Sequence, residues 1–432
     1  MKKLICIILS FMMLFSFLSI STVVSATEII YGDVNDDGVV DMKDYLMMKK
    51  RIAGLVNNLQ INRLNTDING DGKINVLDLN KLAKHLTNKE ILGKTTYYAM
   101  DELSDSMNLV GRAVLDNDKV LLSQTASGIK FKANCNGDLI FYVTTAAKGY
   151  MDIIVDDNYD NVTRVAVSSA KTKYQQELGL SEGEHTITLL KATEWSQNNL
   201  ITLSAVSIFG EKANAKPATR PHRIEFYGDS LTSGYGNFNK EKGSIFYTWD
   251  CQDGGQTYAT FLSNKLNAEW AIASASGFGV LGGHSDHTSL YSKFFDYSVV
   301  NSTDPSKNIK WSRSDFDADL IIINYGTNDD TRARKEGLDI DAFVAECGKI
   351  IAAMRADNPD VKILWNIGMA SVSDSSDVVT ALKTVASTYN IDFYKCPAKA
   401  NGGDGHPTIE DHKYHAENLY NKINELYPDL FK

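Results

Sequence analysis

The chain has 432 residues and is acidic, with 54 Asp and Glu residues against 44 Lys and Arg residues and a formal net charge of −10. A single hydrophobic core rarely serves more than about 300 residues, so this length excludes a one-domain protein. A hydrophobic content of 43% excludes wholesale disorder, and the lack of a basic stripe argues against nucleic acid as a partner.

The first 26 residues have the pattern of an export signal. A basic start is followed by an apolar run and by the sequence Val-Ser-Ala at residues 24–26. This order predicts a signal peptide over residues 1–26, cleaved after Ala26, and a secreted protein. A membrane anchor is the alternative. No basic stop-transfer cluster follows, however, and no later segment is apolar over the length of a bilayer, so no membrane partner is expected.

A twelve-residue pattern then occurs twice, at residues 33–44 and 67–78. Each copy has oxygen-bearing side chains at positions 1, 3, 5, 9 and 12 and glycine at position 6, which is the ligand order of an EF-hand loop. Calcium takes six to eight hard oxygen ligands. We therefore predict two Ca²⁺ ions. The predicted ligands, with Val39 and Lys73 acting through their main-chain carbonyls, are Asp33, Asn35, Asp37, Val39, Asp41, Asp44, Asp67, Asn69, Asp71, Lys73, Asn75 and Asp78.

Two features distinguish these loops from a standard EF-hand. Position 12 is aspartate, and a helical pattern follows each loop, at residues 44–52 and 78–86, without an entering helix before it. Residues 29–92 resemble a type I dockerin, the module that attaches enzymes to the cohesins of a cellulosome scaffold. The resemblance implies a cohesin partner, attachment to a cellulosome and four partner-selecting residues, Met42, Lys43, Val76 and Leu77. Calcium-free turns rich in Asp, Asn and Gly are the alternative.

Residues 94–212 have the periodicity of short strands. Alternating runs at 128–133, 138–145, 150–157, 164–169, 185–192 and 201–210 are separated by Gly, Asn and Asp. This spacing without helices predicts an all-β sandwich or jelly roll. Such a domain either binds sugar or packs against its neighbour, and packing is favoured. Gly111, Arg112, residues 183–186, Lys191, Thr193 and Glu194 resemble the N-terminal jelly roll of carbohydrate esterase family 2.

The last predicted domain, residues 220–432, has the pattern of an α/β fold with a parallel sheet. Ser230 follows a short β-prone run, and Asn328 follows a fully apolar one. Sites in such folds gather at the carboxyl ends of the strands. Because the residue two beyond the serine is Thr232, this is not the Gly-x-Ser-x-Gly elbow of ordinary α/β-hydrolases.

The polar residues at these strand ends suit acyl transfer. A serine hydroxyl becomes a good nucleophile when a base takes its proton, and His406 is the predicted base for Ser230. The resulting oxyanion needs preformed donors. We predict that these are the main-chain NH groups of Ser230 and Gly277 and the side-chain amide of Asn328. No catalytic cofactor is expected.

The order Ser, Gly, Asn, His in these blocks resembles the signature of the SGNH hydrolases, and with the preceding domain it resembles carbohydrate esterase family 2. That resemblance implies an acetylesterase that removes O-acetyl groups from plant polysaccharides such as xylan and glucomannan. Many SGNH enzymes carry an aspartate three residues before the histidine, where this chain has Gly403. As in some members of family 2, we expect the main-chain carbonyl of Asp404 to orient His406, which gives a Ser-His dyad.

Two other functions stay open at this point. One is an SGNH lipase or lysophospholipase, which the dockerin disfavours, and the other is a carbohydrate-binding module with a degenerate esterase site. Trp249 is the first candidate for a sugar subsite, ahead of Tyr235, Phe278 and Trp365, although a core position is favoured over a subsite for each of these aromatic side chains.

Three expectations concern the remaining residues. The catalytic part is expected to be monomeric. His412 and His415, on the predicted last helix, are expected at the surface or the edge of the core. Four cysteines are expected to be buried thiols, with one disulfide left open, namely Cys135, Cys251, Cys347 and Cys396.

Overall fold

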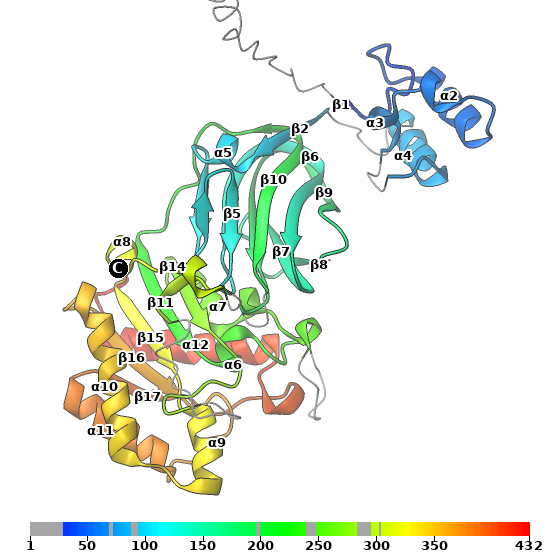
Figure 1. The fold of residues 1–432 in the computed structure, drawn as a ribbon. Coiled ribbons are helices and arrows are strands. Elements are labelled where there is room, and N and C mark those ends of the chain that lie inside the picture. The colour runs from blue at the N-terminus through cyan, green and yellow to red at the C-terminus, as the bar shows by residue number, and fades with distance from the viewer. Residues whose placement is uncertain are drawn as a thin grey trace, which may run out of the picture. The chain divides into compact units, whose positions relative to one another are not determined.

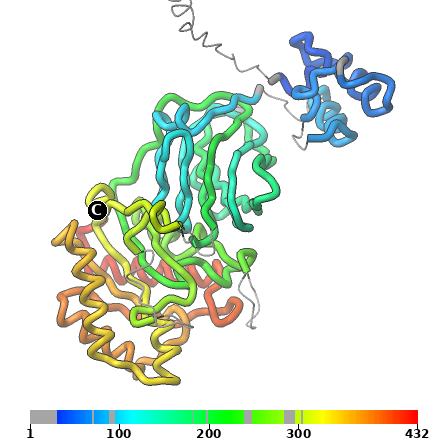
Figure 2. The backbone as a smooth tube through the Cα atoms, viewed as in Figure 1, coloured from blue at the N-terminus to red at the C-terminus, as the bar shows by residue number. Residues whose placement is uncertain are grey.

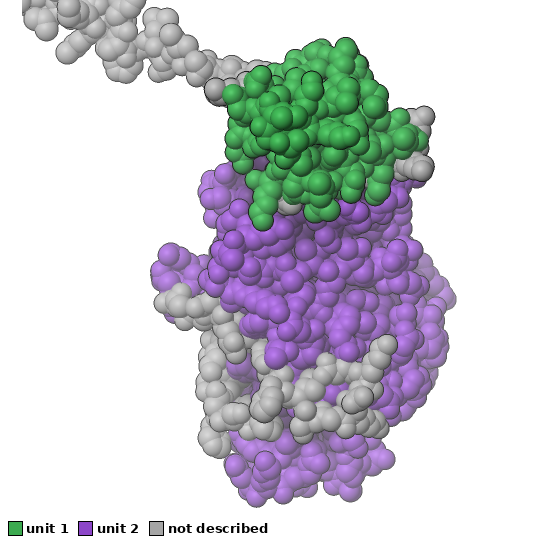
Figure 3. Space-filling model, turned by 90° about the vertical axis from the view of Figure 1, so that its right-hand side faces the viewer, with its two compact units in different colours: residues 1–87 green, residues 88–432 purple. Residues whose placement is uncertain are grey.

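The computed structural model describes residues 29–68, 72–87, 94–195, 199–238, 248–282, 295–301 and 304–432. The predicted signal peptide and the predicted calcium ligands Asn69 and Asp71 lie outside the described residues. The chain divides into two compact units, residues 1–87 and residues 88–432 (Figure 3). Within the described ranges, no helix is long and apolar enough to cross a bilayer.

The first unit is small and helical. Its elements are β1 (Ile29–Ile30), α2 (Met42–Ile52), η2 (Asn58–Gln60), α3 (Arg63–Thr66) and α4 (Val76–Leu86). Helices α2 and α4 start with matching capping boxes. In each box the side chain of the cap residue, Asp41 or Asn75, accepts a main-chain NH of the first turn, and the aspartate three residues later accepts the main-chain NH of the cap residue. The short helix α3 directly precedes the second loop. The prediction that neither loop has an entering helix is therefore wrong for that loop, because Asn62 caps an extra helical turn.

The β domain confirms the predicted all-β fold, since every strand pair in it is antiparallel (Figure 1). The strand order is β2-β10-β6-β9-β7-β8, with β3 on β6, β5 on β10 and β4 on β5. The elements are β2 (Lys94–Ala99), α5 (Met100–Leu103), β3 (Met107–Val110), β4 (Val114–Asp116), β5 (Lys119–Leu122), β6 (Gly128–Thr145), β7 (Gly149–Val155), β8 (Thr163–Val167), β9 (Lys173–Lys191) and β10 (Ile201–Lys212).

Strands β6 and β9 are longer than the sequence pattern indicates. The predicted runs 128–133 and 138–145 form one strand, β6, whose register with β9 shifts around Gly137. Gly137 has φ 68°, a conformation that favours glycine. The sequence pattern therefore predicts a strand end at this position, where the structure has a local irregularity within one strand.

The last domain contains a parallel sheet of order β12-β11-β15-β16-β17, which confirms the predicted α/β fold (Figure 1). Its backbone runs from green through yellow to red in Figure 2. Its strands are β11 (His222–Gly228), β12 (Ala268–Ser274), β15 (Leu320–Asn324), β16 (Lys362–Ile367) and β17 (Asp392–Lys395), and β13 (Tyr297–Val299) and β14 (Ile309–Lys310) form a separate pair. Its helices are α6 (Ser230–Ser233), α7 (Tyr258–Lys265), α8 (Arg313–Phe316), α9 (Thr327–Glu336), α10 (Ile340–Asp357), α11 (Asp377–Tyr389) and α12 (Ile409–Leu426).

Alternate residues of β15, the central strand, face opposite sides of this sheet. Ile321 and Ile323 belong to the apolar cluster that includes α10 and α11. Ile322 belongs to the cluster that includes α7 and α12. Because both faces are covered, β15 is a continuous apolar run, as expected of a buried parallel strand.

The β domain and the parallel-sheet domain share part of their core. Ala126 and Leu190 of the β domain lie in the same apolar cluster as Phe226 and Trp270. The Trp270 indole also donates a hydrogen bond to the Ala126 carbonyl at 2.9 Å. Arg112 is fully buried and donates to the Phe295 carbonyl at 2.8 Å. These contacts agree with the favoured prediction that the β domain packs against its neighbouring domain.

Two expectations about single residues can be compared with the fold. The cysteines of the described residues, Cys135, Cys251, Cys347 and Cys396, are buried and unpaired. The expectation that His412 and His415 lie at the surface or the edge of the core is wrong, because both are completely buried. His412 accepts from the Tyr258 main-chain NH at 3.3 Å, so these histidines are on the inner face of α12.

Candidate active site

The predicted nucleophile lies where strand β11 passes into a short helix. Strand β11 ends at Gly228 and α6 begins at Ser230, with Asp229 as the helix cap. A Cβ at Gly228 would lie 1.9 Å from Thr232 Oγ1, so the close packing of this turn requires glycine. The turn leaves Ser230 with 7% exposure at the carboxyl edge of the sheet.

His406 is within hydrogen-bonding distance of this serine. Ser230 Oγ and His406 Nε2 are 2.8 Å apart, and His406 Nδ1 is 3.0 Å from the Asp404 main-chain oxygen. A proton on Nδ1 would be donated to that carbonyl, which leaves Nε2 as the acceptor for the serine hydroxyl. The geometry is that of a serine and a base oriented by the main chain. The Asp404 backbone has φ 54°.

The environment of His406 favours its neutral form. Burial lowers the pKa of His406 below its ordinary value of 6.5, although the Asp404 carbonyl opposes this effect. A neutral imidazole is the form that can accept a proton. The site is therefore suited to base catalysis at neutral pH.

Two residues contact His406 that the sequence did not place beside it, and one of them, Tyr235, was named only as a candidate for a sugar subsite. The Tyr235 ring meets the imidazole edge to face, with centroids 4.6 Å apart. Gly236 has φ 86°, and a Cβ there would lie 2.7 Å from His406 Cβ. The run Gly-Tyr-Gly at residues 234–236 indicates a tight turn, but it does not indicate that the loop of His406 packs against this turn.

The predicted oxyanion donors lie on three successive elements of the sheet edge. Neither the Ser230 NH nor the Gly277 NH donates a hydrogen bond to another residue in the described part of the chain. Gly277 has φ 83° and lies in the turn after β12. Asn328 Nδ2 donates to the Phe278 carbonyl at 2.7 Å and to Asp229 Oδ2 at 3.2 Å. An oxyanion would compete for the longer of these two bonds.

Two buried carboxyl groups, which the sequence did not single out, support this edge. Asp329 accepts hydrogen bonds from the NH groups of Val280 and Leu281 at 2.8 and 2.9 Å. Burial raises the pKa of Asp229 to about 7 and that of Asp329 to about 6. The loop after β12 is therefore held by the start of α9.

The aromatic candidates for a sugar subsite occupy different environments. Trp249 is partly buried, and its main-chain oxygen accepts from Arg164 of the β domain at 3.0 Å. Phe278 is partly exposed beside Gly277. Trp365 is completely buried and donates to the Tyr325 carbonyl at 3.0 Å, which makes it a core residue. This burial confirms the favoured expectation of a core position for Trp365 and excludes the residue as a sugar platform.

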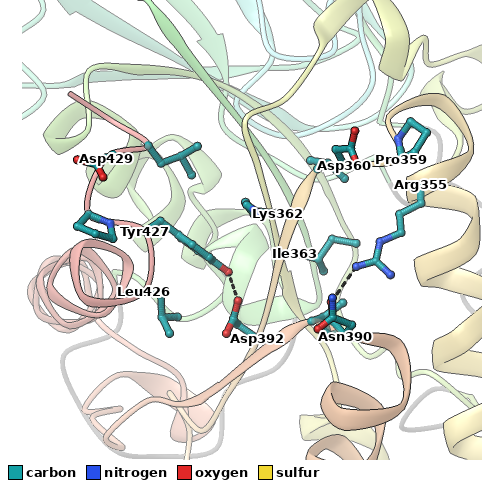
Figure 4. A pocket seen from close by; sticks show the side chains of 14 residues that line it. Arg355, Pro359, Asp360, Lys362, Ile363, Asn390, Asp392, Leu426, Tyr427 and Asp429 are labelled. Carbon is teal, nitrogen blue, oxygen red and sulfur yellow. Dashed lines mark hydrogen bonds between the residues drawn. The ribbon is translucent and has the colours of Figure 1, made fainter.

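A pocket of about 840 Å³ lies at the opposite, amino-terminal edge of the sheet (Figure 4). Its polar side chains already serve the fold. Arg355 donates to the Tyr389 and Asn390 carbonyls at 2.7 and 2.9 Å, and Tyr427 donates to Asp392 at 2.6 Å. We therefore do not assign a reaction to this pocket.

The first EF-hand-like loop has the donors that calcium prefers. Asp33 and Asp44 are at most 1% exposed, and their oxygens accept main-chain NH groups of the loop, including Gly38 NH at 2.9 Å. Within the described residues, no three Asp, Glu, His or Cys side chains are grouped as metal ligands. The loop also supplies amide and main-chain oxygens, so its donor set fits a hard cation.

The residues predicted to select a cohesin lie at the starts of α2 and α4. Met42, Val76 and Leu77 are each more than half exposed, so these apolar side chains are accessible.

A parallel sheet with Ser230, Asn328 and His406 at its carboxyl edge, and without a Gly-x-Ser-x-Gly elbow, is the arrangement expected of the class of SGNH, or GDSL-like, hydrolases. The family descriptions that match the chain agree with each part of this assignment. They are a dockerin type I domain over residues 31–87, a carbohydrate esterase 2 N-terminal domain over 109–217 and a GDSL-like lipase/acylhydrolase family over 226–418. The chain therefore combines a type I dockerin domain with the two domains typical of family 2 carbohydrate esterases.

The chain is similar to two curated proteins. It is 27% identical to the cellulase/esterase CelE of Acetivibrio thermocellus over 308 residues, which cover 67% of this chain and 36% of the relative. It is 28% identical to an acetylxylan esterase/glucomannan deacetylase of Cellvibrio japonicus over 244 residues, which cover 50% of this chain and 64% of the relative. The alignments thus span about a third and just under two thirds of these relatives.

Solved structures share the fold. A family 2 carbohydrate esterase from Clostridium thermocellum in complex with cellohexaose has a TM-score of 0.66 and 24% identity, covering 74% of this chain and 99% of that one. An acetyl xylan esterase from Butyrivibrio proteoclasticus has a TM-score of 0.67 and 17% identity, covering 78% of this chain and 100% of that one.

Proposed function

We propose that this protein is a secreted cellulosomal esterase that removes O-acetyl groups from plant cell-wall polysaccharides, with Ser230 as nucleophile and His406 as base. The observation that carries the proposal is the 2.8 Å approach of Ser230 Oγ to His406 Nε2, with Nδ1 directed to a main-chain oxygen. A base that is oriented in this way can take the serine proton as the hydroxyl attacks a carbonyl carbon.

The reaction would proceed through two acyl transfers. Ser230 Oγ bonds to the acetyl carbonyl carbon, its proton passes to His406, and the oxyanion is held by the NH groups of Ser230 and Gly277 with the Asn328 amide. Collapse breaks the bond to the sugar oxygen, which takes the proton from His406. Water then repeats the sequence on the acetyl-serine and releases acetate.

The substrate class is supported by the relatives. One similar protein is described as an acetylxylan esterase/glucomannan deacetylase, and a structure of the same fold was solved with cellohexaose. The net charge of −10 suits a neutral polysaccharide better than an anionic polymer.

The dockerin would attach the enzyme to a scaffold. Type I dockerins are calcium-binding modules, and we propose two Ca²⁺ ions held by the twelve predicted ligands. Bound calcium would neutralise the buried carboxylates of Asp33 and Asp44 and so stabilise the unit that presents α2 and α4. Met42, Lys43, Val76 and Leu77 would contact the cohesin.

The deciding experiment measures acetate release from acetylated xylan and acetylated glucomannan by the mature chain. Ser230→Ala should abolish release, and Ser314→Ala, an exposed serine on α8, should behave as the wild type. Acetate release that persists in Ser230→Ala would refute this nucleophile.

Two alternatives predict different results. Preference for long-chain esters would indicate a lipase or lysophospholipase. Glycan binding by wild type and Ser230→Ala, without acetate release by either, would indicate a carbohydrate-binding module with a degenerate site.

A further inference from the structure

One side chain of the β domain reaches the loop that carries a predicted oxyanion donor. Glu194 follows strand β9 and is only 2% exposed. Its Oε2 accepts hydrogen bonds from the Ser276 NH at 2.7 Å and from the Ser276 hydroxyl at 3.0 Å. Ser276 immediately precedes Gly277, so the carboxylate holds the peptide next to the donor.

Glu194 is itself held rigidly by buried groups. Its main-chain NH donates to Gln252 Oε1 at 2.9 Å. Its carbonyl accepts from Lys191 Nζ at 2.7 Å, and this ammonium also donates to the Ser123 and Thr193 carbonyls at 2.7 Å each. Lys191 is completely buried, and these three carbonyls match the three donors of its ammonium group. The segment that presents Glu194 is therefore anchored at several points.

The loop after β12 is anchored on both sides of Gly277. Ser276 is held by Glu194, and the Phe278 carbonyl accepts from the Asn328 amide at 2.7 Å. The next residues, Val280 and Leu281, are held by Asp329. Gly277 itself has φ 83° and has no side chain of its own that could anchor it, so its NH direction depends on these neighbours.

From this geometry we infer that Glu194 is a positioning residue for the oxyanion hole, and that the β domain is thus part of the active-site machinery. An oxyanion hole is effective because its donors are oriented before charge develops. Without the carboxylate, the Gly277 NH would have to be oriented during the reaction. This inference rests on the proposed function, because it concerns the same site.

The main test compares Glu194→Ala, Glu194→Gln and Glu184→Gln in the full chain with a soluble acetate ester. Glu194→Ala should lower kcat by roughly 10- to 100-fold with little change in KM, since the loss falls on the transition state. Glu194→Gln keeps an oxygen that can accept the Ser276 NH, so it should recover part of that loss. Glu184→Gln is the matched control, at an exposed ion pair between Glu184 of β9 and Lys132 of β6, and it should leave kcat unchanged.

A second readout does not depend on the acetylated substrate. A fluorophosphonate probe forms a P–O bond to Ser230 Oγ, loses fluoride and passes the serine proton to His406, while its phosphoryl oxygen occupies the oxyanion hole. Glu194→Ala should be labelled at least about tenfold more slowly than the wild type. Circular dichroism of each variant shows whether it is folded, and Glu194→Gln provides the test if Glu194→Ala is not.

The outcomes are distinguishable. Equal labelling rates and equal kcat in wild type and folded Glu194 variants would overturn the inference, as would a rise in KM at constant kcat. Wild-type labelling without acetate release would overturn the proposed substrate while the labelling rates still decide the role of Glu194. Absence of wild-type labelling would overturn both.

Discussion

His406 is bound on one side by a serine hydroxyl and on the other by a peptide oxygen rather than a carboxylate. A carbonyl can fix the ring and its tautomer, but it offers a developing imidazolium less charge compensation than an aspartate. Burial in the same place lowers the pKa of His406. We therefore predict that the His406 imidazole stays neutral to a lower pH than an ordinary histidine.

The pH dependence of the reaction checks this point. Since neutral His406 is required and its pKa is lowered, kcat/KM for a neutral acetate ester should fall with an acid-limb midpoint below 6.5. An Asp229→Asn variant removes the neighbouring carboxyl, whose pKa is raised to about 7, and should keep the same limb. A midpoint above 6.5 in that variant would contradict the assignment.

The orienting role of the main chain makes a separate prediction. Asp404→Asn keeps the carbonyl, and asparagine tolerates the left-handed conformation at φ 54°. We expect this variant to retain most of its kcat, whereas His406→Ala should lose roughly a thousandfold. A loss in Asp404→Asn as large as that in His406→Ala would show that the carboxylate takes part.

At the scale of elements, helices α2 and α4 depend on the loops that precede them. Their first-turn aspartates, Asp44 and Asp78, are completely buried and accept the NH of the helix cap. The same two residues are the predicted twelfth ligands of the loops. Helix capping and the proposed calcium binding would therefore use the same side chain in each repeat.

Removal of calcium should consequently unfold the first unit and leave the second unit intact. In calorimetry of the full chain, EDTA should shift or abolish one transition at low temperature and leave the larger one unchanged, because binding energy contributes directly to folding in small metal-binding modules. Excess Ca²⁺ should restore the transition, and Asp33→Ala should weaken that recovery. Identical curves with and without EDTA would refute calcium binding.

At the scale of the whole molecule, the contact between the β domain and the parallel-sheet domain includes a buried acidic pair. Asp152 on β7 and Asp253 are both fully buried, and neither carboxyl oxygen of Asp152 has a hydrogen-bond partner within the described ranges. Burial, and then the nearby Asp253 carboxylate, raise the pKa of Asp152 well above its ordinary value. The folded protein thus binds a proton that the unfolded chain releases.

The raised pKa of Asp152 predicts how the free energy of unfolding changes with pH. A raised carboxyl pKa contributes stability that is complete below about pH 4 and is lost as pH rises through the folded-state pKa. Asp152→Asn is neutral throughout, so its stability relative to the wild type should rise as pH increases from about 4 toward the raised pKa of Asp152, by up to about 1.4 kcal/mol per pH unit. The exposed variant Asp118→Asn should show no such trend, and a constant difference for Asp152→Asn would contradict the prediction.

The sequence by itself determined the three-part fold and the residues Ser230 and His406 as candidates for the chemistry. Both inferences use local rules, because the periodicity of a strand or an EF-hand loop is set by residues close in the chain. The tertiary structure alone decided which distant segments meet. Glu194 and Ser276 are 82 residues apart, and the burial of His412 depends on which face of α12 packs inward. No spacing encodes such contacts, because they arise when separate elements exclude water from a shared core.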